Sequence, residues 1–385
     1  MKPKIGFVLS VSLLASPMTV GQAQAQGAAA PSASCVPPAQ PALQSDARRG
    51  AGAPGQVQPL IQALIQPTQP GRGEAPQRGS RDATVMPIPA VVAAGAAWTK
   101  VWQAGGNSAD GILADKDGNA LVAQEDYDAV LKIDRNDKAS VLVANAKGVG
   151  SLSMDRQGRL YGAHRTERPG STKPDQASIV NAITILAPDR KLVADKWADG
   201  AILSVRPNDL AADNQGGVYF TSGCLYYAGT NGAARVVAEN LRTNGIVFSP
   251  DDKVLYVTNG GGQSPGTIVA FDVTGPGVLA NRRDFATLRM GNGDGSAVDS
   301  AGRLYVTSNP GVQVFDKTGN FLGVIPTPRG VISVAFAGPD KKTLYVVGSG
   351  AEDANRQPIR EGPQQTAATI YRLPMIAQGV QGRAK

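Results

Sequence analysis

Histidine is almost absent from this chain of 385 residues, and its single copy, His164, follows a short apolar run. A Ser–His–acid triad or a pair of catalytic histidines is therefore hard to build here. A surface histidine beside Arg165 is a simpler interpretation of His164 than a catalytic one. The sequence also has no P-loop, and "GNGDG" at 291–295 lacks the helix context of a dinucleotide-binding motif.

Charge is scarce as well, since only 18% of the residues are Asp, Glu, Lys or Arg. Of the formal net charge of +7, residues 1–25 carry two units and residues 26–97 carry another two, so residues 98–385 keep +3. That part of the chain has no stripe of Arg and Lys interleaved with aromatic residues. We therefore expect no nucleic-acid partner.

Long apolar stretches are missing, so the sequence offers no membrane-spanning helix. The stretch "IGFVLSVSLLA" near the N-terminus is too short to span a bilayer, follows Lys2 and Lys4, and precedes the small residues "AQA" at 23–25. Residues 1–25 are thus predicted to be a secretory signal peptide, which indicates a periplasmic or secreted protein. A short membrane anchor is the alternative, and no other membrane association is expected.

The next segment, residues 26–97, has almost no side chains to bury and is rich in Ala, Pro, Gln and Gly. This composition predicts disorder, although "VMPIPAVV" at 85–92 could dock on the rest of the protein.

Cysteine is scarce too. Cys35 lies in this segment and Cys224 in the remainder, and the sequence leaves open whether the two pair.

Glycine and proline are abundant, with 46 and 27 copies, which favours many short strands joined by turns. From Trp98 a pattern recurs in which a short strand, an Asp/Gly/Asn turn and a second strand reading roughly L-Y-V-T follow one another. Its copies begin at residues 110, 150, 208, 244, 294 and 333. A period near 40 with about four strands per copy is typical of a β-propeller. Residues 98–385 are therefore predicted to be all-β, a six-bladed propeller with four-stranded blades, and a β-sandwich is the alternative.

Ring closure gives a further expectation for the start of this region. A strand formed by residues 98–103 should pair with the last blade, because closure removes exposed sheet edges.

The residue at the head of each blade's first strand should point into one mouth of the central channel. "TNGIVFSPDDKVLYVT" illustrates this, because Asn-Gly usually marks a hairpin turn but here the turn is better placed at "SPDDK". The six heads are Asp110, Gly150, Asn208, Asn244, Asp294 and Ser333.

Four of these heads are carboxylates or carboxamides, and the glycine leaves space. Two carboxylates in such a ring repel each other unless a cation lies between them. Oxygen ligands without His or Cys suit Ca²⁺, or Mg²⁺ or Mn²⁺. The alternative is that these side chains only cap turns and satisfy backbone amides.

Four stretches carry a resemblance to a known family: "RPNDLAAD", "TNGIVFSPDDKVLYVT", "GDGSAVDSAGRLYVTS" and "GVQVFDKTGNFLGVIPTP". The chain resembles, over roughly residues 100–375, the senescence marker protein/gluconolactonase/luciferin-regenerating-enzyme family. The resemblance implies six blades and one divalent metal at the channel mouth. We expect Ca²⁺, with Mg²⁺, Mn²⁺ or Zn²⁺ as alternatives. The family's metal ligands correspond to Asp110, Asn208, Asn244 and Asp294, and Asp110 departs from the family's usual Glu.

The resemblance implies a metal-dependent hydrolase of lactones or related esters that acts on a small molecule. Because of the predicted signal peptide we expect the protein to be exported, and we also expect a monomer. The metal would polarise the carbonyl, and Asp294 would serve as both ligand and general base toward water, with a metal-bound hydroxide as the alternative. Arg206 would orient the substrate. Two other interpretations stay open: a hydrolase of another electrophile such as a phosphotriester, and a non-catalytic propeller that binds a ligand or partner.

Overall fold

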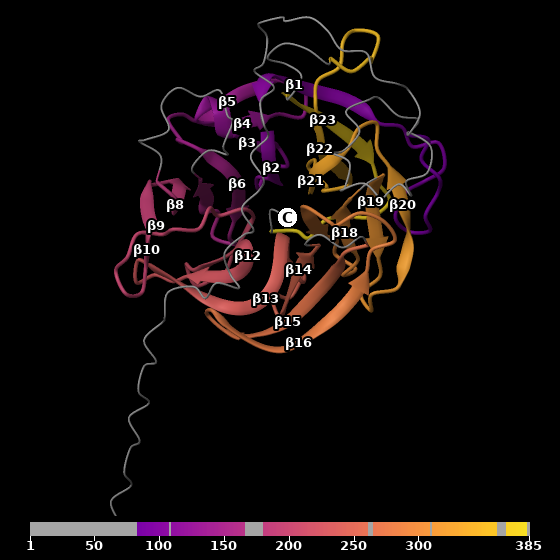
Figure 1. Cartoon of the computed structure of the whole chain (residues 1–385). Coiled ribbons are helices and arrows are strands. Elements are labelled where there is room, and N and C mark those ends of the chain that lie inside the picture. The colour runs from indigo at the N-terminus through magenta and orange to yellow at the C-terminus, as the bar shows by residue number, and fades with distance from the viewer. Residues whose placement is uncertain are drawn as a thin grey trace, which may run out of the picture.

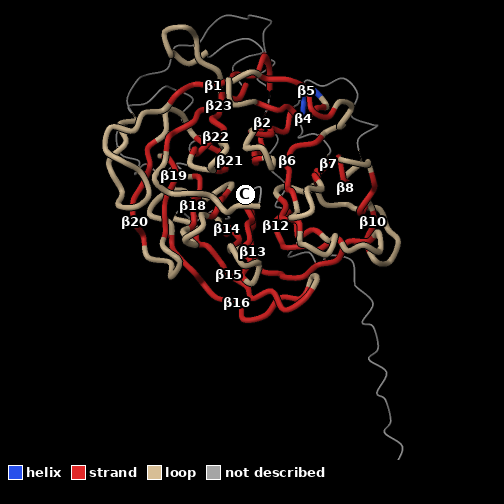
Figure 2. Tube along the Cα trace, turned by 180° about the vertical axis from the view of Figure 1, so that it is seen from behind, coloured by secondary structure: helices blue, strands red, loops and turns tan. Residues whose placement is uncertain are grey.

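The structure of the protein is a computed structural model that describes residues 83–107, 109–165, 180–260, 265–308, 310–359 and 367–382. Regular structure in these ranges is almost entirely β-strand, with a single short 3-10 helix, η2 (Glu125–Tyr127) (Figure 2). No helix in the described ranges is long and apolar enough to cross a membrane. The prediction of an all-β chain is confirmed, whereas the predicted signal peptide and most of the predicted disordered segment lie outside the described residues.

Four of the five sheets have four strands in antiparallel order. The first is β2 (Ala109–Ala114), β3 (Ala120–Gln124), β4 (Ala129–Ile133) and β5 (Ala139–Val143), and the second is β6 (Val149–Met154), β7 (Leu160–His164), β8 (Ala182–Ala187) and β9 (Lys191–Ala194). The other two are β17 (Ser296–Val298), β18 (Leu304–Thr307), β19 (Gly311–Phe315) and β20 (Phe321–Pro326), and then β21 (Val331–Ala337), β22 (Thr343–Ser349), β23 (Ala367–Pro374) and β1 (Thr99–Asn107).

The fifth sheet has seven strands and departs from this pattern. It consists of β11 (Leu210–Ala212), β12 (Val218–Ala228), β13 (Ala233–Phe248), β14 (Val254–Asn259), β15 (Thr267–Gly275) and β16 (Val278–Thr287), with the two-residue β10 (Lys196–Trp197) added in parallel to β13. The 16-residue β13 pairs with β12 along its first part and with β14 along its last part. Six separate four-stranded blades are therefore not confirmed, because one continuous strand belongs to two successive repeats.

The sheets stand around a common centre, with β2, β6 and β21 nearest to it and β5, β9, β16 and β20 toward the rim (Figure 1). Neighbouring repeats meet through their first strands: β2 lies beside β6, β6 beside β11, β11 beside β13, β13 beside β17, β17 beside β21, and β21 beside β2. This cyclic order is what the repeat pattern of a propeller requires.

The apolar core is divided among the spaces between adjacent sheets. Ile112 of β2 shares a buried cluster with Ala335 of β21, and Leu113, the next residue of β2, shares another with Leu152 of β6. Because β22 buries both of its faces, its sequence reads as a continuous apolar run, "LYVV", rather than as an alternating one.

The polar turns between first and second strands are held by aspartates. In "DRQGRLY", one oxygen of Asp155 accepts hydrogen bonds from the backbone N–H groups of Gln157 and Arg159, and the other accepts from the Tyr161 hydroxyl at 3.2 Å. The equivalent turn after β17 repeats the arrangement around Asp299. The recurring Asp of these turns therefore has a structural role, as an Asx turn.

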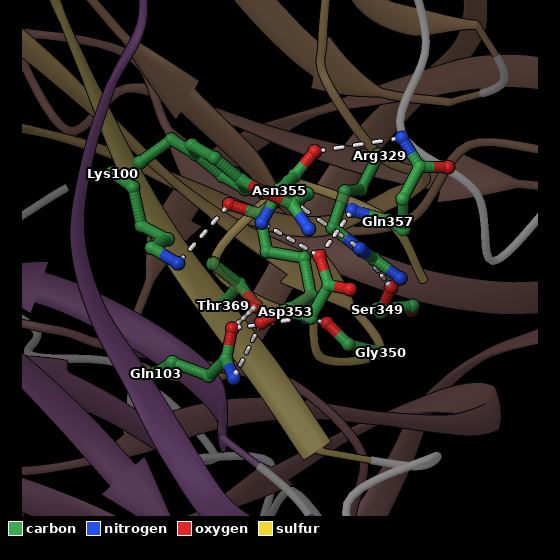
Figure 3. Close-up of polar contacts among 11 residues, drawn as sticks. Lys100, Gln103, Arg329, Ser349, Gly350, Asp353, Asn355, Gln357 and Thr369 are labelled. Atoms are coloured by element: carbon green, nitrogen blue, oxygen red, sulfur yellow. Dashed lines mark hydrogen bonds and ion pairs between the residues drawn. The ribbon is translucent and has the colours of Figure 1, made fainter. Parts of the chain in front are cut away.

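Ring closure follows the prediction made for residues 98–103, because β1 pairs with β23 in the last sheet. The side chain of Gln103 in β1 bonds both backbone groups of Glu352, with distances of 3.0 and 3.2 Å, and accepts from the Thr369 hydroxyl (Figure 3). Lys100 lies 3.3 Å from the same glutamate's carboxylate. The ends of the ring are thus joined by backbone pairing and by side-chain contacts.

Two further features concern points that the sequence left open, the docking of residues 85–92 and the state of Cys224. Val85, Ile88, Val91 and Val92 are buried against the last two sheets, so the "VMPIPAVV" stretch does dock on the propeller. Cys224 in β12 is fully buried and disulfide-bonded, and Cys35 lies outside the described residues.

Candidate active site

The predicted head residues lie at one end of the first strands, where the pairing is irregular. Asp110 falls between the pairs Ala109–Gln124 and Ile112–Val122, and Asn244 falls within β13 between the paired residues Thr243 and Ile246. A bulge of this kind re-aims a side chain away from the regular pleat. Asn244 is therefore a strand residue at the passage from one repeat to the next, as the placement of the hairpin turn at "SPDDK" requires.

The glycine after Asn244 has a packing reason. A Cβ atom on Gly245 would lie 2.0 Å from the backbone oxygen of Asp294, the head of the next repeat. Only glycine lets the two backbones approach this closely. The Asn-Gly pair thus brings the heads of two neighbouring repeats together.

In three repeats a threonine of the second strand contacts the backbone at the start of the next repeat. The Thr221 hydroxyl donates to the backbone carbonyl of Asn244 at 2.5 Å, and the Thr258 hydroxyl lies 3.3 Å from that of Asp294. Thr307 repeats the contact with the carbonyl of Ile332 at 3.2 Å. The Thr of the L-Y-V-T pattern therefore fixes the backbone that presents the heads.

Three of the predicted ligands lie in one polar network. The network also contains two arginines and a glutamate, which the sequence did not predict to lie beside them. We call this network the head cluster, and it consists of Asp110, Glu125, Arg165, Arg206, Asn208 and Asn244.

Arg165, directly after β7, is at the centre of the head cluster. Its Nη2 is ion-paired with Asp110 Oδ2 and lies 3.1 Å from Glu125 Oε2, and its Nη1 donates to Asn208 Oδ1 at 3.1 Å. Asn208 Nδ2 in turn donates to Asn244 Oδ1 at 2.5 Å. One guanidinium thus connects the heads of the first and third repeats. The hydrogen bond between the two asparagine side chains extends the network to the fourth repeat.

The Arg165 side chain has no exposed surface. Burial lowers the pKa of Arg165, but the carboxylates of Asp110 and Glu125 raise it by more, so its net pKa is above the usual value. The guanidinium is therefore a permanent positive charge at the centre of the head cluster.

Arg206 reaches the cluster from the loop before β11. Its Nη2 donates to Glu125 Oε1 at 2.6 Å, so the two oxygens of Glu125 hold two different arginines. The Arg206 side chain keeps 23% of its surface exposed, and that of Asp110 keeps 26%. These two residues are the accessible charges of the cluster, of opposite sign.

The position of Asp294 at the start of the fifth repeat is fixed by contacts of its backbone. Its N–H donates to the Thr307 carbonyl at 2.9 Å, its own carbonyl lies against Gly245, and the residue is partly buried. Asn208 is held in the equivalent way, because its N–H donates to the Thr221 carbonyl at 2.7 Å.

His164 lies next to Arg165 but takes part in other contacts. Its Nδ1 is 2.6 Å from the Lys147 carbonyl and its Nε2 is 2.7 Å from the Thr184 hydroxyl. A carbonyl can only accept, so Nδ1 carries the proton and Nε2 accepts from threonine in the neutral ring. Burial lowers the pKa of His164, which keeps it neutral.

Whether these residues fit a divalent metal can be judged from the donors. Their types are suitable, since carboxylate and amide oxygens are what Ca²⁺ binds. However, Asp110 Oδ2 and Asn208 Oδ1 are already engaged by Arg165, and Asn244 Oδ1 accepts from Asn208. With Arg165 bound to these oxygens, the arrangement does not suit a divalent ion, and the Ca²⁺ site predicted at Asp110, Asn208, Asn244 and Asp294 stays a prediction.

Glu125 and Arg165 were not among the predicted site residues. Both directly follow a buried second strand, "ALVAQ" and "LYGAH", at equivalent positions of the first two repeats. A charged residue at that point of two successive repeats is the signal that could have identified them.

The fold agrees with the comparisons with known proteins. The family described as SMP-30/Gluconolactonase/LRE-like region matches residues 136–350, more than half of the chain. This chain belongs to the SMP-30/gluconolactonase/LRE-like family. Pentonolactonase XacC of Haloferax volcanii is 30% identical over 187 residues, which cover 45% of this chain and 64% of that protein.

Solved structures of family members support the fold. A gluconolactonase from Xanthomonas campestris has a TM-score of 0.57 at 23% identity, covering 78% of this chain and all of that one. A regucalcin from Agrobacterium tumefaciens, described as a calcium-binding protein, has a TM-score of 0.56 at 17% identity, covering 74% of this chain and 95% of that one. At these identities the likeness extends to the fold alone.

The curated relatives are matched over only part of their lengths. The chain spans 32%, 64% and 52% of three of them, all named as lactone hydrolases. Their names suggest a reaction for this chain, which has to be argued from its own residues.

Proposed function

We propose that the protein is a lactone hydrolase whose reaction takes place at the head cluster, next to Asp294. The observation that carries this proposal is the pair formed by Arg206 and Glu125, 2.6 Å apart, which presents an accessible guanidinium beside the strand heads. The names of the curated relatives add support, because they describe enzymes that open pentonolactones and gluconolactones.

In the proposed reaction, Arg206 receives the carbonyl oxygen of the lactone. Its N–H donors stabilise the negative charge that develops there when water adds to the carbonyl carbon. Glu125 holds the guanidinium in place, so that little reorganisation is needed during the step.

Asp294 is the proposed general base. It takes a proton from the attacking water, the bond between the carbonyl carbon and the ring oxygen breaks, and Asp294 returns the proton to the ring oxygen to give the hydroxy acid. A base in this role contributes a factor of about 10² to 10⁴ to the rate. No step is assigned to a divalent metal, because the head cluster as arranged does not fit one.

The surrounding architecture is proposed as six blades, with β13 contributing to both the third and the fourth. The cyclic succession of first strands supports this count. Export through a signal peptide at residues 1–25, a periplasmic or secreted location and a monomeric state are part of the same proposal, and they rest on the sequence.

The proposal is tested with a panel of five- and six-membered aldonolactones, using the wild-type protein and Asp294→Asn. Asn keeps the size of the side chain but cannot accept the proton. We expect the variant to lose roughly 100-fold or more in kcat. Equal activity of the two proteins would show that Asp294 is not the base, and no hydrolysis above the buffer rate for any lactone would favour a binding protein.

A further inference from the structure

The second repeat has no side chain at its head, and Arg165 fills that place. A Cβ atom on Gly150 would lie 1.8 Å from Arg165 Nε and 1.9 Å from Nη2. The guanidinium therefore lies directly against the Gly150 backbone, where the side chain of a head residue would otherwise be. Among the six strand heads, the second position therefore holds the positive charge of Arg165 instead of a side-chain oxygen.

The charges of the head cluster alternate and balance. Arg206 contacts Glu125, Glu125 contacts Arg165, and Arg165 contacts Asp110, so two positive and two negative groups form one chain of contacts. A further carboxylate, Asp209, acts on Arg165 at longer range but uses its oxygens to accept from Ser151 and from the backbone N–H groups of β11 and β13. The contacts around Arg165 thus already neutralise the carboxylates that a metal would need.

A divalent cation at the same oxygens would lie close to the guanidinium. Ca²⁺ binds oxygen at about 2.3–2.6 Å, so an ion held by Asp110 and Asn208 would be a near neighbour of Arg165. Like charges so close together in a buried site repel strongly. The two cations therefore exclude each other.

We propose that Arg165 takes the place of the divalent cation in this chain, and holds Asp110, Glu125 and Asn208 in position as a built-in, non-exchangeable positive charge. The inference uses the proposed function only to identify the head cluster as the site. Arg165 has no exposed surface and so acts as a positioning residue, while Arg206 faces the substrate.

The consequence is a site that needs no metal and that acquires one when the guanidinium is removed. Arg165→Met removes the charge and keeps a long unbranched side chain, which leaves Asp110, Glu125 and Asn208 without a cation. We expect the variant to be less stable than the wild type and to bind Ca²⁺. Because a ligand that binds only the folded state raises its stability, Ca²⁺ should then raise the Tm of the variant.

The test measures Ca²⁺ binding by calorimetry and by the shift in Tm, with chelator-treated protein and no substrate. The wild type and Arg165→Lys, which keeps the positive charge, should show neither binding nor a shift at millimolar Ca²⁺. Arg165→Met should bind one Ca²⁺ per chain and show a higher Tm with Ca²⁺, and adding Asp110→Asn should abolish both effects.

Two results would overturn the inference. One is a wild type that binds one Ca²⁺ and loses this binding in Asp110→Asn. The other is a folded Arg165→Met chain that binds none, because the oxygens would then form no cation site.

If Arg165→Met does not fold, Gly150→Ala serves in its place, since the added methyl group displaces the guanidinium without deleting it. Turnover is not measured in any of these arms. A wild type that binds no Ca²⁺ and hydrolyses no lactone would therefore refute the proposed function and leave this inference standing.

Discussion

Arg165, at the end of β7, is ion-paired with Asp110, at the start of β2, across 55 positions of sequence. The pair connects the second strand of one repeat with the head of the repeat before it. Because the Arg165 side chain is completely buried, its positive charge has to be stabilised by the carboxylates around it, and the geometry of the site depends on that charge.

Glu125 should be important for stability, because it is the shared partner of Arg165 and Arg206. Glu125→Gln removes the negative charge and leaves the buried guanidinium with one direct carboxylate partner. We expect a loss of roughly 3 kcal/mol in the free energy of unfolding, measured with urea. Asp117→Asn is the matched control, since it breaks an exposed pair with Lys116 and should cost little. Equal effects of the two substitutions would contradict the role given to Glu125.

Thr221 should position Asn244 through its hydroxyl group. Thr221→Val keeps the shape of the side chain but leaves the Asn244 carbonyl without this donor in a buried position. We expect a loss of about 1–3 kcal/mol in the free energy of unfolding and a lower kcat/KM.

The control for this substitution is Thr274→Val. Its hydroxyl also donates to a backbone carbonyl, that of Val278, but it is exposed. It should have a small effect on stability and none on kcat/KM. If Thr221→Val also leaves both quantities unchanged, the threonine does not fix the strand head.

His164 should make the protein less stable in mild acid. Its pKa is lowered in the folded state by burial, so the folded protein binds this proton less readily than the unfolded chain, whose His pKa is near 6.5. Its stabilising contribution is therefore fully present above pH 6.5 and is lost as the pH falls from there through the folded-state pKa.

Two measurements test this expectation. As the chain has one histidine, its imidazole NMR signals report a single titration, and the midpoint should lie below 6.5. His164→Asn, which retains an N–H donor for the Lys147 carbonyl, should weaken the pH dependence of the unfolding free energy below pH 6.5. A midpoint above 6.5 would mean that a charged ring is stabilised instead.

Sequence alone could predict the features that repeat. The strand heads recur with the L-Y-V-T strands, so the sequence locates Asp110, Asn208 and Asn244 at equivalent ends of their strands. The closing strand could be predicted as well, because an unpaired edge in the last sheet requires a partner.

Features that depend on how one repeat meets the next could not be predicted in this way. The continuity of β13 is invisible because its two parts belong to different copies of the pattern. Arg165 follows a strand end, and a side chain there can point to solvent or inward. It points inward here because Gly150 leaves space and because Asp110 and Glu125 supply negative charge from another repeat. Such long-range compensation has no local signal in the sequence.

The most direct test of the account is the rate of lactone opening by the wild-type protein after removal of divalent metals. A pentonolactone and a gluconolactone are offered with EDTA, then with added Ca²⁺, and the buffer rate is subtracted. Our account predicts hydrolysis above the buffer rate that changes by less than about twofold between the two conditions. Hydrolysis that disappears with EDTA and returns with Ca²⁺ would contradict it, as would the absence of hydrolysis under both conditions.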